Sequence, residues 1–272
     1  MTEEGTAATR AEAVVDALGV LYHDNLDPDE FMLFPDDGVT IEADGDRSDW
    51  GEPFGGRPAF ECLVRTILSQ NTSDTASQPA HQHLLDRYDD GDLAESLAAA
   101  DHATLAETIQ SAGLYNQKAE KIIGAAQWVL DEYGSAEAFD AFVTGGDPAE
   151  VRERLLSVDG VGPKTADCVL LFSGGRGGVF PVDTHVHRIA RRMGLADLDA
   201  DHEAVREGLE ASVPAEKCGF GHTAMIQFGR EYCAARKPAC LDDPEACPLA
   251  DRCEQVGVDP VEGAVTDPSD TV

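Results

Sequence analysis

The strongest constraint on the fold is an apolar stripe with helical spacing in residues 116–133. Its members recur every three or four residues: Ala119, Ile122, Ile123, Ala126, Val129, Leu130 and Tyr133. Such spacing places apolar side chains on one face of a helix. Similar patterns occupy 11–22, 58–70, 78–88, 102–112, 149–157, 163–173, 184–193, 202–212 and 220–232, whereas strand-like alternation does not persist. The sequence therefore predicts an all-α fold.

Two segments differ from these helical patterns in composition. Residues 25–57 are rich in Asp, Gly and Pro and predict an irregular connector. Residues 254–272 are acidic and poor in apolar side chains, which predicts a disordered tail. The chain has no long apolar run and no basic, apolar leader, so we expect a cytoplasmic protein that does not contact membranes. We also expect it to be a monomer.

The charge of the chain is extreme, since 52 acidic and 20 basic residues give a net charge of −32. Such a field repels nucleic acid, but it also keeps a protein soluble in concentrated salt, where repulsion is screened. We favour salt adaptation over an acidic partner-binding surface or a disordered tail. Residues 160–192 reverse the balance and predict a basic strip, the footprint of DNA binding at one face. Its members are Lys164, Arg176, Arg188, Arg191 and Arg192.

A tight turn, Gly160-Val-Gly162, separates two of the predicted helices. Pro163 follows it and suits the first position of a new helix. The glycines permit close approach of the backbone to a ligand, and N–H groups at a helix start bind phosphate without reading base sequence. An ordinary helical hairpin accounts for the two glycines equally well.

Lys164 and Asp183 are the candidate catalytic residues. Lys164 lies in the first turn of a helix, where the dipole disfavours the ammonium and favours the neutral, nucleophilic amine. The alternatives are a surface lysine or a phosphate contact. Asp183 is expected to cap the next helix, and a fixed carboxylate there can also stabilise a developing cation. His185 and His187 do not have the spacing of two metal ligands on one helical face.

Four cysteines lie within 21 residues: Cys233, Cys240, Cys247 and Cys253. In a reducing compartment this density indicates Zn²⁺ or a [4Fe–4S] cluster. The gaps of six, six and five residues lack the close pairs of structural zinc and favour the larger cluster. A braced loop would present Arg236 and Lys237 to a phosphate backbone. Cys62 and Cys168 are predicted to be inert core residues, and Cys218 is ambiguous.

Together these segments resemble the endonuclease III branch of the helix-hairpin-helix DNA glycosylases, over about residues 57–253. Gly113 to Ala119 is similar to the family's GLYNxKA segment, and Gly160 to Ala166 to its hairpin with the catalytic lysine. Val182 to His185 is similar to its VDTH motif with the catalytic aspartate. The cysteine pattern resembles its cluster loop, although the family's usual middle gap is two residues and here it is six.

A further segment, Leu68 to Asp74, corresponds to the family's LSAQATD-like turn. The glutamine that enters DNA in the family aligns with Asn71, and Gln70 lies one position earlier. The resemblance implies that one of these two side chains fills the space left by a base that has been flipped out of the duplex.

The resemblance implies a two-lobed, all-α helix-hairpin-helix glycosylase fold. An acidic helix and connector, 1–56, would pack with the C-terminal lobe. A helical barrel-like domain with the hairpin would span 57–179. The C-terminal helices and iron–sulfur loop would span 180–253, followed by the tail, 254–272. Lys164 and Asp183 would then lie at the mouth of the cleft between the lobes.

The implied function is base excision repair by a bifunctional DNA glycosylase and abasic-site lyase. Lys164 would attack the sugar C1′ of a damaged, oxidised pyrimidine nucleotide in double-stranded DNA, and Asp183 would stabilise the cationic sugar. The four cysteines would hold a [4Fe–4S] cluster. The implied DNA-binding residues are Gln70, Asn71, Gly160, Gly162, Thr165, His185, Arg188, Arg236 and Lys237.

Three other interpretations remain open at this point. An adenine- or thymine-mismatch glycosylase would share the fold and cluster, although the adenine group lacks a lysine at position 164. A non-catalytic DNA-binding iron–sulfur protein would not need both Lys164 and Asp183. A zinc-stabilised interaction domain would leave the hairpin unexplained.

Overall fold

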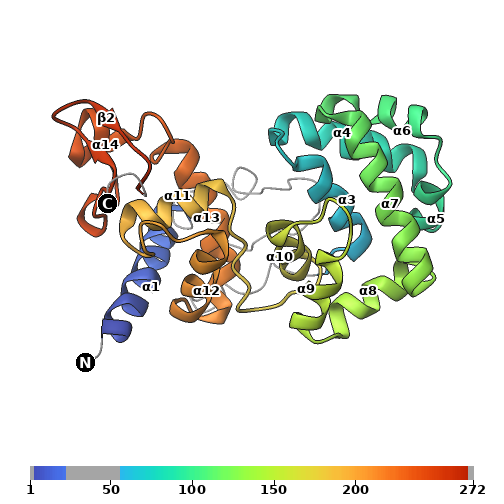
Figure 1. Ribbon diagram of the computed structural model, residues 1–272, viewed down its shortest axis with the longest axis horizontal. Coiled ribbons are helices and arrows are strands. Elements are labelled where there is room, and N and C mark those ends of the chain that lie inside the picture. Colours follow the sequence, from blue (N-terminus) through green and yellow to red (C-terminus); the bar gives the residue numbers. More distant parts are fainter. Residues whose placement is uncertain (1–2, 23–55, 269–272) are drawn as a thin grey trace. The chain divides into compact units, whose positions relative to one another are not determined.

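The structure is a computed structural model that describes residues 3–22 and 56–268, and these are mostly helical (Figure 1). The all-α prediction is confirmed. The chain divides into two compact units, one formed by Phe54–Arg176 and the other by Met1–Pro53 with Gly177–Val272. Nearly all of the predicted connector at 25–57 lies outside the described residues.

The unit Phe54–Arg176 is built around α3 (Ala59–Ser69), which packs against α4, α7, α8 and α10. Leu63, Val64, Ile67 and Leu68 of α3 are completely buried, which makes this helix the centre of the core. The surrounding helices are α4 (Asp74–Tyr88), α5 (Leu93–Ala98), α6 (His102–Thr108), η1 (Gln110–Ala112), α7 (Tyr115–Tyr133), α8 (Ala136–Gly145), α9 (Pro148–Leu156) and α10 (Pro163–Phe172).

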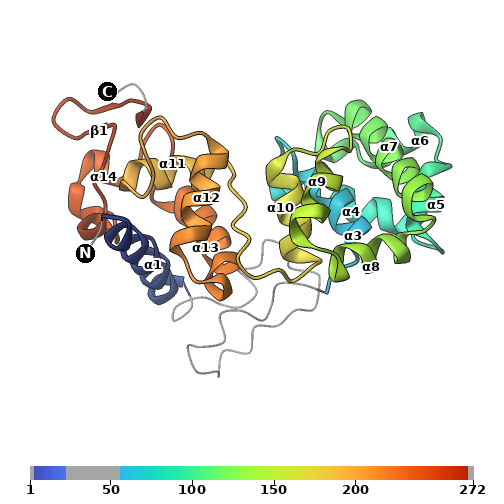
Figure 2. The ribbon, with the colours of Figure 1, turned by 60° about the horizontal axis from the view of Figure 1, so that its bottom comes forward.

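In the other unit, helices from the two ends of the chain lie side by side. The N-terminal helix α1 (Glu3–Tyr22) packs against α12 (His202–Ser212) and α13 (Cys218–Glu231), as Figures 1 and 2 show. α11 (Thr184–Met193) packs against α13 and α12. The remaining elements are η2 (Ala215–Lys217), α14 (Ala239–Asp242), η3 (Pro244–Ala246), η4 (Ala250–Arg252), β1 (Val258–Asp259) and β2 (Ala264–Val265).

Many helices begin behind an aspartate, which gives part of the acidic composition a local role. The side chains of these residues accept N–H groups of the first helical turn and so stabilise the helix start. They are Asp92, Asp101, Asp147, Asp183 and Asp201.

The C-terminal tail differs from the prediction of disorder, which is wrong for residues 254–268. β1 and β2 form an antiparallel hairpin that pairs Val258 with Val265. The buried guanidinium of Arg191 forms a double ion pair with Asp267, at 2.9 and 3.0 Å. A buried guanidinium needs a partner, and this one comes from the tail. The acidic composition of the tail does not indicate that one of its residues pairs with a distant arginine.

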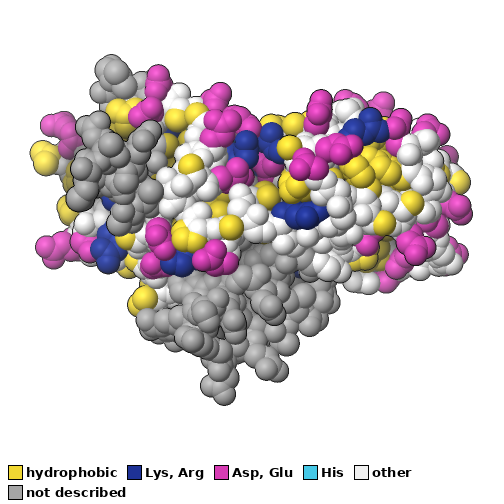
Figure 3. Space-filling view, turned by 90° about the horizontal axis from the view of Figure 1, so that it is seen from below, with side chains coloured by type: hydrophobic (Ala, Val, Ile, Leu, Met, Phe, Trp, Pro, Cys, Tyr) yellow, Lys and Arg dark blue, Asp and Glu magenta, His cyan; other side chains and the backbone are white. Residues whose placement is uncertain are grey.

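The surface carries the excess negative charge. Figure 3 shows acidic side chains spread over one face of the molecule, with few Lys and Arg among them. None of the described helices combines the length and apolarity that crossing a bilayer requires.

Candidate functional site

The predicted helix-turn-helix is present as α9, a short turn and α10. Val158 and Val161 are buried, and the Val161 N–H donates to the Val158 carbonyl at 3.0 Å. Gly160 has φ +80°, a conformation that favours glycine. Gly162 is the N-cap of α10 and Pro163 is its first residue. The first N–H groups of a helix have no intrahelical partner, so an anion can bind them here.

Lys164 occupies the second position of α10, directly behind the turn, and is half-buried. Two residues that follow it in α10 are held by hydrogen bonds. The buried Thr165 hydroxyl accepts from Gln70 Nε2, and the buried carboxylate of Asp167 accepts from Arg152 Nε at 2.7 Å. The start of α10 is therefore held rigidly against the rest of this unit.

The structure separates the roles of Gln70 and Asn71. The Gln70 Nε2 group donates to the Gly160 carbonyl at 3.0 Å and to Thr165 Oγ1 at 3.3 Å. Asn71 is exposed and has φ +53°, a conformation that Asn tolerates better than most residues. Gln70 thus braces the hairpin, whereas Asn71 forms the exposed tip of the turn between α3 and α4.

Sequence reasoning missed the buried lysine that supports this turn. Lys118 is only 3% exposed, and its Nζ donates to the Leu68 carbonyl at 2.6 Å, Thr72 Oγ1 at 2.7 Å and the Ala112 carbonyl at 2.9 Å. Burial, with a smaller effect of Lys121, lowers the Lys118 pKa to about 8. Its position in the GLYNQKA segment gave no indication of these distant partners.

A second exposed turn, which carries Leu114, adjoins the exposed turn that carries Asn71. Leu114, directly before α7, has φ +46° and is 55% exposed. Left-handed backbone is rare for a bulky residue, and large apolar side chains gain free energy by burial. Lys118 and a hydrogen bond from Thr72 to the Ala112 carbonyl join this turn to the Asn71 turn. Apolar periodicity gave no indication that this leucine is exposed.

Asp183 lies in the other unit and is the N-cap of α11, as the sequence predicts. Its Oδ1 accepts the N–H groups of His185 at 2.8 Å and Val186 at 2.9 Å. Both capping bonds use the same oxygen, so Oδ2 takes no part in the cap. The carboxylate is only half-buried, which leaves it accessible to a ligand.

Arg188 has an internal role in this structure. Its Nε and Nη2 donate to the Cys233 carbonyl at 3.1 and 2.9 Å, and Nη2 lies 3.2 Å from His185 Nδ1. The His185 ring in turn lies against Gly229, where a Cβ would come within 2.5 Å of Nδ1. Burial lowers the His185 pKa. These contacts favour a bracing function for Arg188 over the predicted contact with DNA.

Three arginines of the predicted basic strip at 160–192 make internal contacts. Arg176 donates to the carbonyls of Thr144 and Gly146 at 2.6 and 2.7 Å. Arg191 is paired with the tail, and Arg192 is buried and donates to the Ala234 and Ala235 carbonyls. Closeness in sequence does not show which carbonyls each guanidinium meets, so these contacts were not predicted. DNA binding by the strip stays a prediction.

The four clustered cysteines share one loop region of α14, η3 and η4. Burial raises the pKa of Cys240, Cys247 and Cys253, and neighbouring thiols of the group raise each further. The Gln255 N–H donates to Cys253 Sγ at 3.3 Å, and Arg192 Nη1 lies 3.6 Å from Cys233 Sγ. Such donors favour thiolates, as a metal or cluster requires. Across 3–22 and 56–268, however, no three acidic, His or Cys side chains are arranged as a metal site.

The six residues between Cys240 and Cys247 form a short, compact loop. α14 ends at Asp242, and Asp243 caps the 3-10 turn η3 by accepting the Glu245 N–H at 3.0 Å. The added residues are mostly exposed, so they extend the loop outward without adding to its interior.

Arg236 and Lys237 lie exposed on this loop, as predicted, and Lys237 pairs with Asp242 at 3.0 Å. The other cysteines, Cys62, Cys168 and Cys218, are buried in the core. Burial raises the pKa of Cys62 and of Cys218 to about 12, which makes both thiols unreactive.

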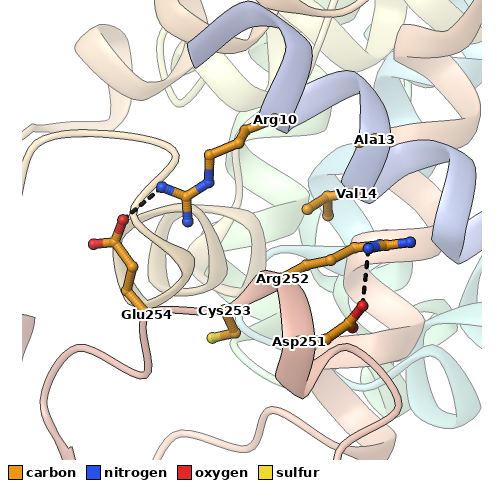
Figure 4. Close-up of a pocket in the computed structure, with 7 residues that line it drawn as sticks. All are labelled: Arg10, Ala13, Val14, Asp251, Arg252, Cys253 and Glu254. Atoms are coloured by element: carbon orange, nitrogen blue, oxygen red, sulfur yellow. Dashed lines mark hydrogen bonds and ion pairs between the residues drawn. The ribbon is translucent and has the colours of Figure 1, made fainter. Parts of the chain in front are cut away.

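A pocket of about 510 Å³ separates α1 from the end of the cysteine loop (Figure 4). Arg10 of α1 spans it, donating to Glu254 and to the Met193 carbonyl. This helix thus braces the segment that carries Cys253. The lining residues are Arg10, Ala13, Val14, Asp251, Arg252, Cys253 and Glu254.

Comparison with known proteins assigns the fold to a repair family. Residues 64–215 match the HhH-GPD superfamily base excision DNA repair protein. Endonuclease III of Thermotoga maritima is 33% identical over 195 residues, which are 72% of this chain and 82% of that protein. Endonuclease III of Synechocystis sp. is 33% identical over 193 residues, 71% of this chain and 80% of that protein.

Comparison with solved structures supports the same family assignment. A trapped endonuclease III–DNA covalent intermediate is 25% identical, with a TM-score of 0.66 over 94% of this chain and 97% of that chain. A thermostable thymine-DNA glycosylase shares the fold at 22% identity, with a TM-score of 0.64 over 91% of this chain and 96% of that chain. The chain therefore belongs to the endonuclease III family of HhH-GPD base excision DNA repair proteins, and it is a DNA N-glycosylase and abasic-site lyase.

Proposed function

We propose that this enzyme excises oxidised pyrimidines from double-stranded DNA and then nicks the strand by β-elimination. The observation that carries the proposal is the position of Lys164 in the first turn of α10, immediately behind the Gly160–Gly162 turn. A backbone phosphate bound at that turn would bring a nucleotide's sugar near the lysine amine.

The proposed chemistry begins with Lys164. Its neutral amine attacks the sugar C1′, the bond between C1′ and the base breaks, and the base leaves with a proton. The secondary amine opens the sugar to a Schiff base. Loss of a C2′ proton then expels the 3′ phosphate, which breaks the strand, and water hydrolyses the imine to restore the lysine.

Asp183 is proposed to stabilise the positive charge that develops on the sugar and to assist proton transfer. Its Oδ1 is fixed by two backbone N–H groups, so the carboxylate is preorganised, and Oδ2 remains for the substrate. Lys164 and Asp183 belong to different units of the chain. Their meeting at one cleft stays a prediction.

The exposed tips are proposed to hold the duplex open after the lesion is flipped out. Flipping a damaged base costs less unstacking energy than flipping an intact one. Asn71 would occupy the vacated space, because it is exposed whereas Gln70 is bonded to the hairpin. Leu114, exposed on the adjoining turn, would pack against the bases beside the gap.

A [4Fe–4S] cluster is proposed on Cys233, Cys240, Cys247 and Cys253. When bound, it would supply a structural centre for a loop with little apolar core of its own. The Gln255 N–H and the Arg192 guanidinium lie where they would stabilise the charge of thiolate ligands. The exposed Arg236 and Lys237 would contact a phosphate.

The test is borohydride trapping on duplexes with an abasic site or an oxidised pyrimidine, in high salt. Wild type should be trapped covalently and should nick both, while Lys164→Ala should do neither yet still bind. Lys217→Ala is the matched control, because that lysine pairs with Glu12 and Asp16 and should not take part. Equal trapping of wild type and Lys164→Ala would refute the assignment. Excision of uracil or mismatched thymine, without excision of oxidised pyrimidines, would instead indicate a mismatch-specific enzyme.

A further inference from the structure

Lys121 of α7 lies directly against the hairpin turn. A Cβ placed on Gly160 would lie 2.6 Å from Lys121 Cδ, 2.8 Å from Cε and 3.0 Å from Cγ. The absence of a side chain at position 160 therefore leaves room for the aliphatic part of Lys121. The glycine has two functions here, since it also adopts φ +80°.

The ammonium of Lys121 differs from most lysine ammonium groups of this chain. Lys118 donates to two carbonyls and a hydroxyl, Lys217 pairs with two carboxylates, and Lys237 pairs with Asp242. In the part of the chain that the structure describes, no ion pair or hydrogen bond holds Lys121. With a net charge of −32, carboxylates that could pair with a lysine are abundant, so an unpaired lysine beside this turn is unexpected.

We propose that Lys121 is an additional phosphate-binding residue, which supplies positive charge to the DNA backbone held by the hairpin. Backbone N–H groups contribute partial charges only, and the arginines at 176, 188, 191 and 192 are engaged elsewhere. The Lys121 ammonium is one bond beyond Cε, and Cε lies beside the backbone of Gly160. The ammonium therefore reaches an anion bound at the turn. This inference rests on the proposed binding of DNA by the hairpin.

Two substitutions separate charge from packing. Lys121→Met keeps an unbranched side chain against Gly160 and removes the charge, whereas Lys121→Arg keeps the charge. Arg87→Met is the matched control, because Arg87 is an exposed cation in the last turn of α4 in the same unit. Thermal unfolding should show that all three variants are folded.

The experiment measures binding to a duplex with a non-cleavable abasic analogue across a range of salt concentrations. Lys121→Met should bind about 3- to 10-fold more weakly than wild type at low salt. The ratio of the two affinities should shrink as salt rises, with a log–log slope that differs between the two proteins by about 0.9. Single-turnover nicking at saturating enzyme should be unchanged, because Lys121 does not touch the reacting atoms. Lys121→Arg should restore both the affinity and the salt slope.

The outcomes distinguish this inference from the proposed function. If wild type binds and nicks DNA but Lys121→Met behaves as Arg87→Met does, the inference alone is overturned. If wild type binds neither damaged nor intact duplex, the proposed function fails and the inference fails with it.

Discussion

The side-chain amide of Gln70 donates to the backbone carbonyl of Gly160 at 3.0 Å, joining the turn after α3 to the hairpin between α9 and α10. Two segments that lie 90 residues apart are thereby fixed to each other within one unit. One turn carries Asn71, the candidate wedge, and the other carries the candidate phosphate site. Their spacing determines where a flipped nucleotide would lie relative to the gripped backbone.

This relationship predicts different effects for two neighbouring substitutions. Asn71→Gly removes the wedge but keeps a residue that accepts φ +53°, so stability should hold while excision from duplex DNA falls at least tenfold. Gln70→Ala should cost about 1 kcal/mol of stability and weaken binding to intact and damaged duplexes alike. Excision rates on duplex and single-stranded substrates, with thermal unfolding, distinguish the two. A duplex-specific loss in Gln70→Ala alone would reverse the assignment.

Asp183 should prove catalytic beyond its role as a cap. Asn caps helices about as well as Asp, so Asp183→Asn should leave the melting temperature nearly unchanged. Activity should nevertheless fall by orders of magnitude, because the amide cannot stabilise a cationic sugar. Asp183→Ala should lose the same activity and, in addition, about 1 kcal/mol of stability. Wild-type turnover by Asp183→Asn would show that the residue is only a cap.

The fold and the local features of the site could be predicted from sequence because each depends on nearby residues. Helical periodicity, the Asp183 cap and the glycine turn with Pro163 are such features, and the structure has all of them. Lys118 was missed because its partners, the Leu68 and Ala112 carbonyls, come from other segments. The internal contacts of the strip's arginines were missed for the same reason, since Arg176 and Arg192 meet carbonyls that sequence proximity does not identify.

Lys118 should make stability depend on alkaline pH. Burial lowers its pKa from 10.5 to about 8 in the folded chain. Between these values the unfolded state binds more protons than the folded state, so the Lys118 contribution to stability rises with pH. The free energy of unfolding of wild type, minus that of Lys118→Met, should therefore increase from about pH 8 to about pH 10.5.

Lys217→Met provides a control of opposite sign. Burial opposes the shift, but hydrogen bonds from Lys217 to Asp16 and Glu12 raise its pKa. Its contribution to stability is present below the unfolded value of 10.5 and is lost above it. Chemical denaturation at several pH values measures both differences. A flat Lys118 difference across this range would mean that its hydrogen bonds fully offset the burial.

The cluster assignment predicts two classes of cysteine. Serine at Cys233, Cys240, Cys247 or Cys253 should each reduce the iron content or prevent folding of the loop. Serine at Cys62, Cys168 or Cys218 should retain the iron, because these thiols are buried in the helical core. Iron analysis and visible absorbance of the purified proteins measure the difference. Four iron atoms per chain in Cys247→Ser would exclude that residue as a ligand, and a colourless zinc-containing wild type would exclude the cluster.

The last prediction concerns salt. DNA affinity normally falls with salt in proportion to the number of phosphates neutralised. Here most arginines of the expected strip are engaged internally, which leaves few cations for phosphates, whereas the chain as a whole repels DNA with a net charge of −32. Rising salt weakens the attraction between the remaining cations and the phosphates. It also screens the repulsion between the acidic chain and DNA, so the two effects of salt on affinity oppose each other.

We therefore expect binding with a shallow or non-monotonic dependence on salt, and activity that persists near molar potassium chloride. Stability should also rise with salt, because the excess carboxylates repel one another in dilute buffer. Lesion-duplex binding and nicking, measured from low to molar salt with circular dichroism at each point, test both effects. A steep, monotonic loss of binding while the fold stays intact would refute salt adaptation, and would return the acidic surface to the alternative of a partner-binding role.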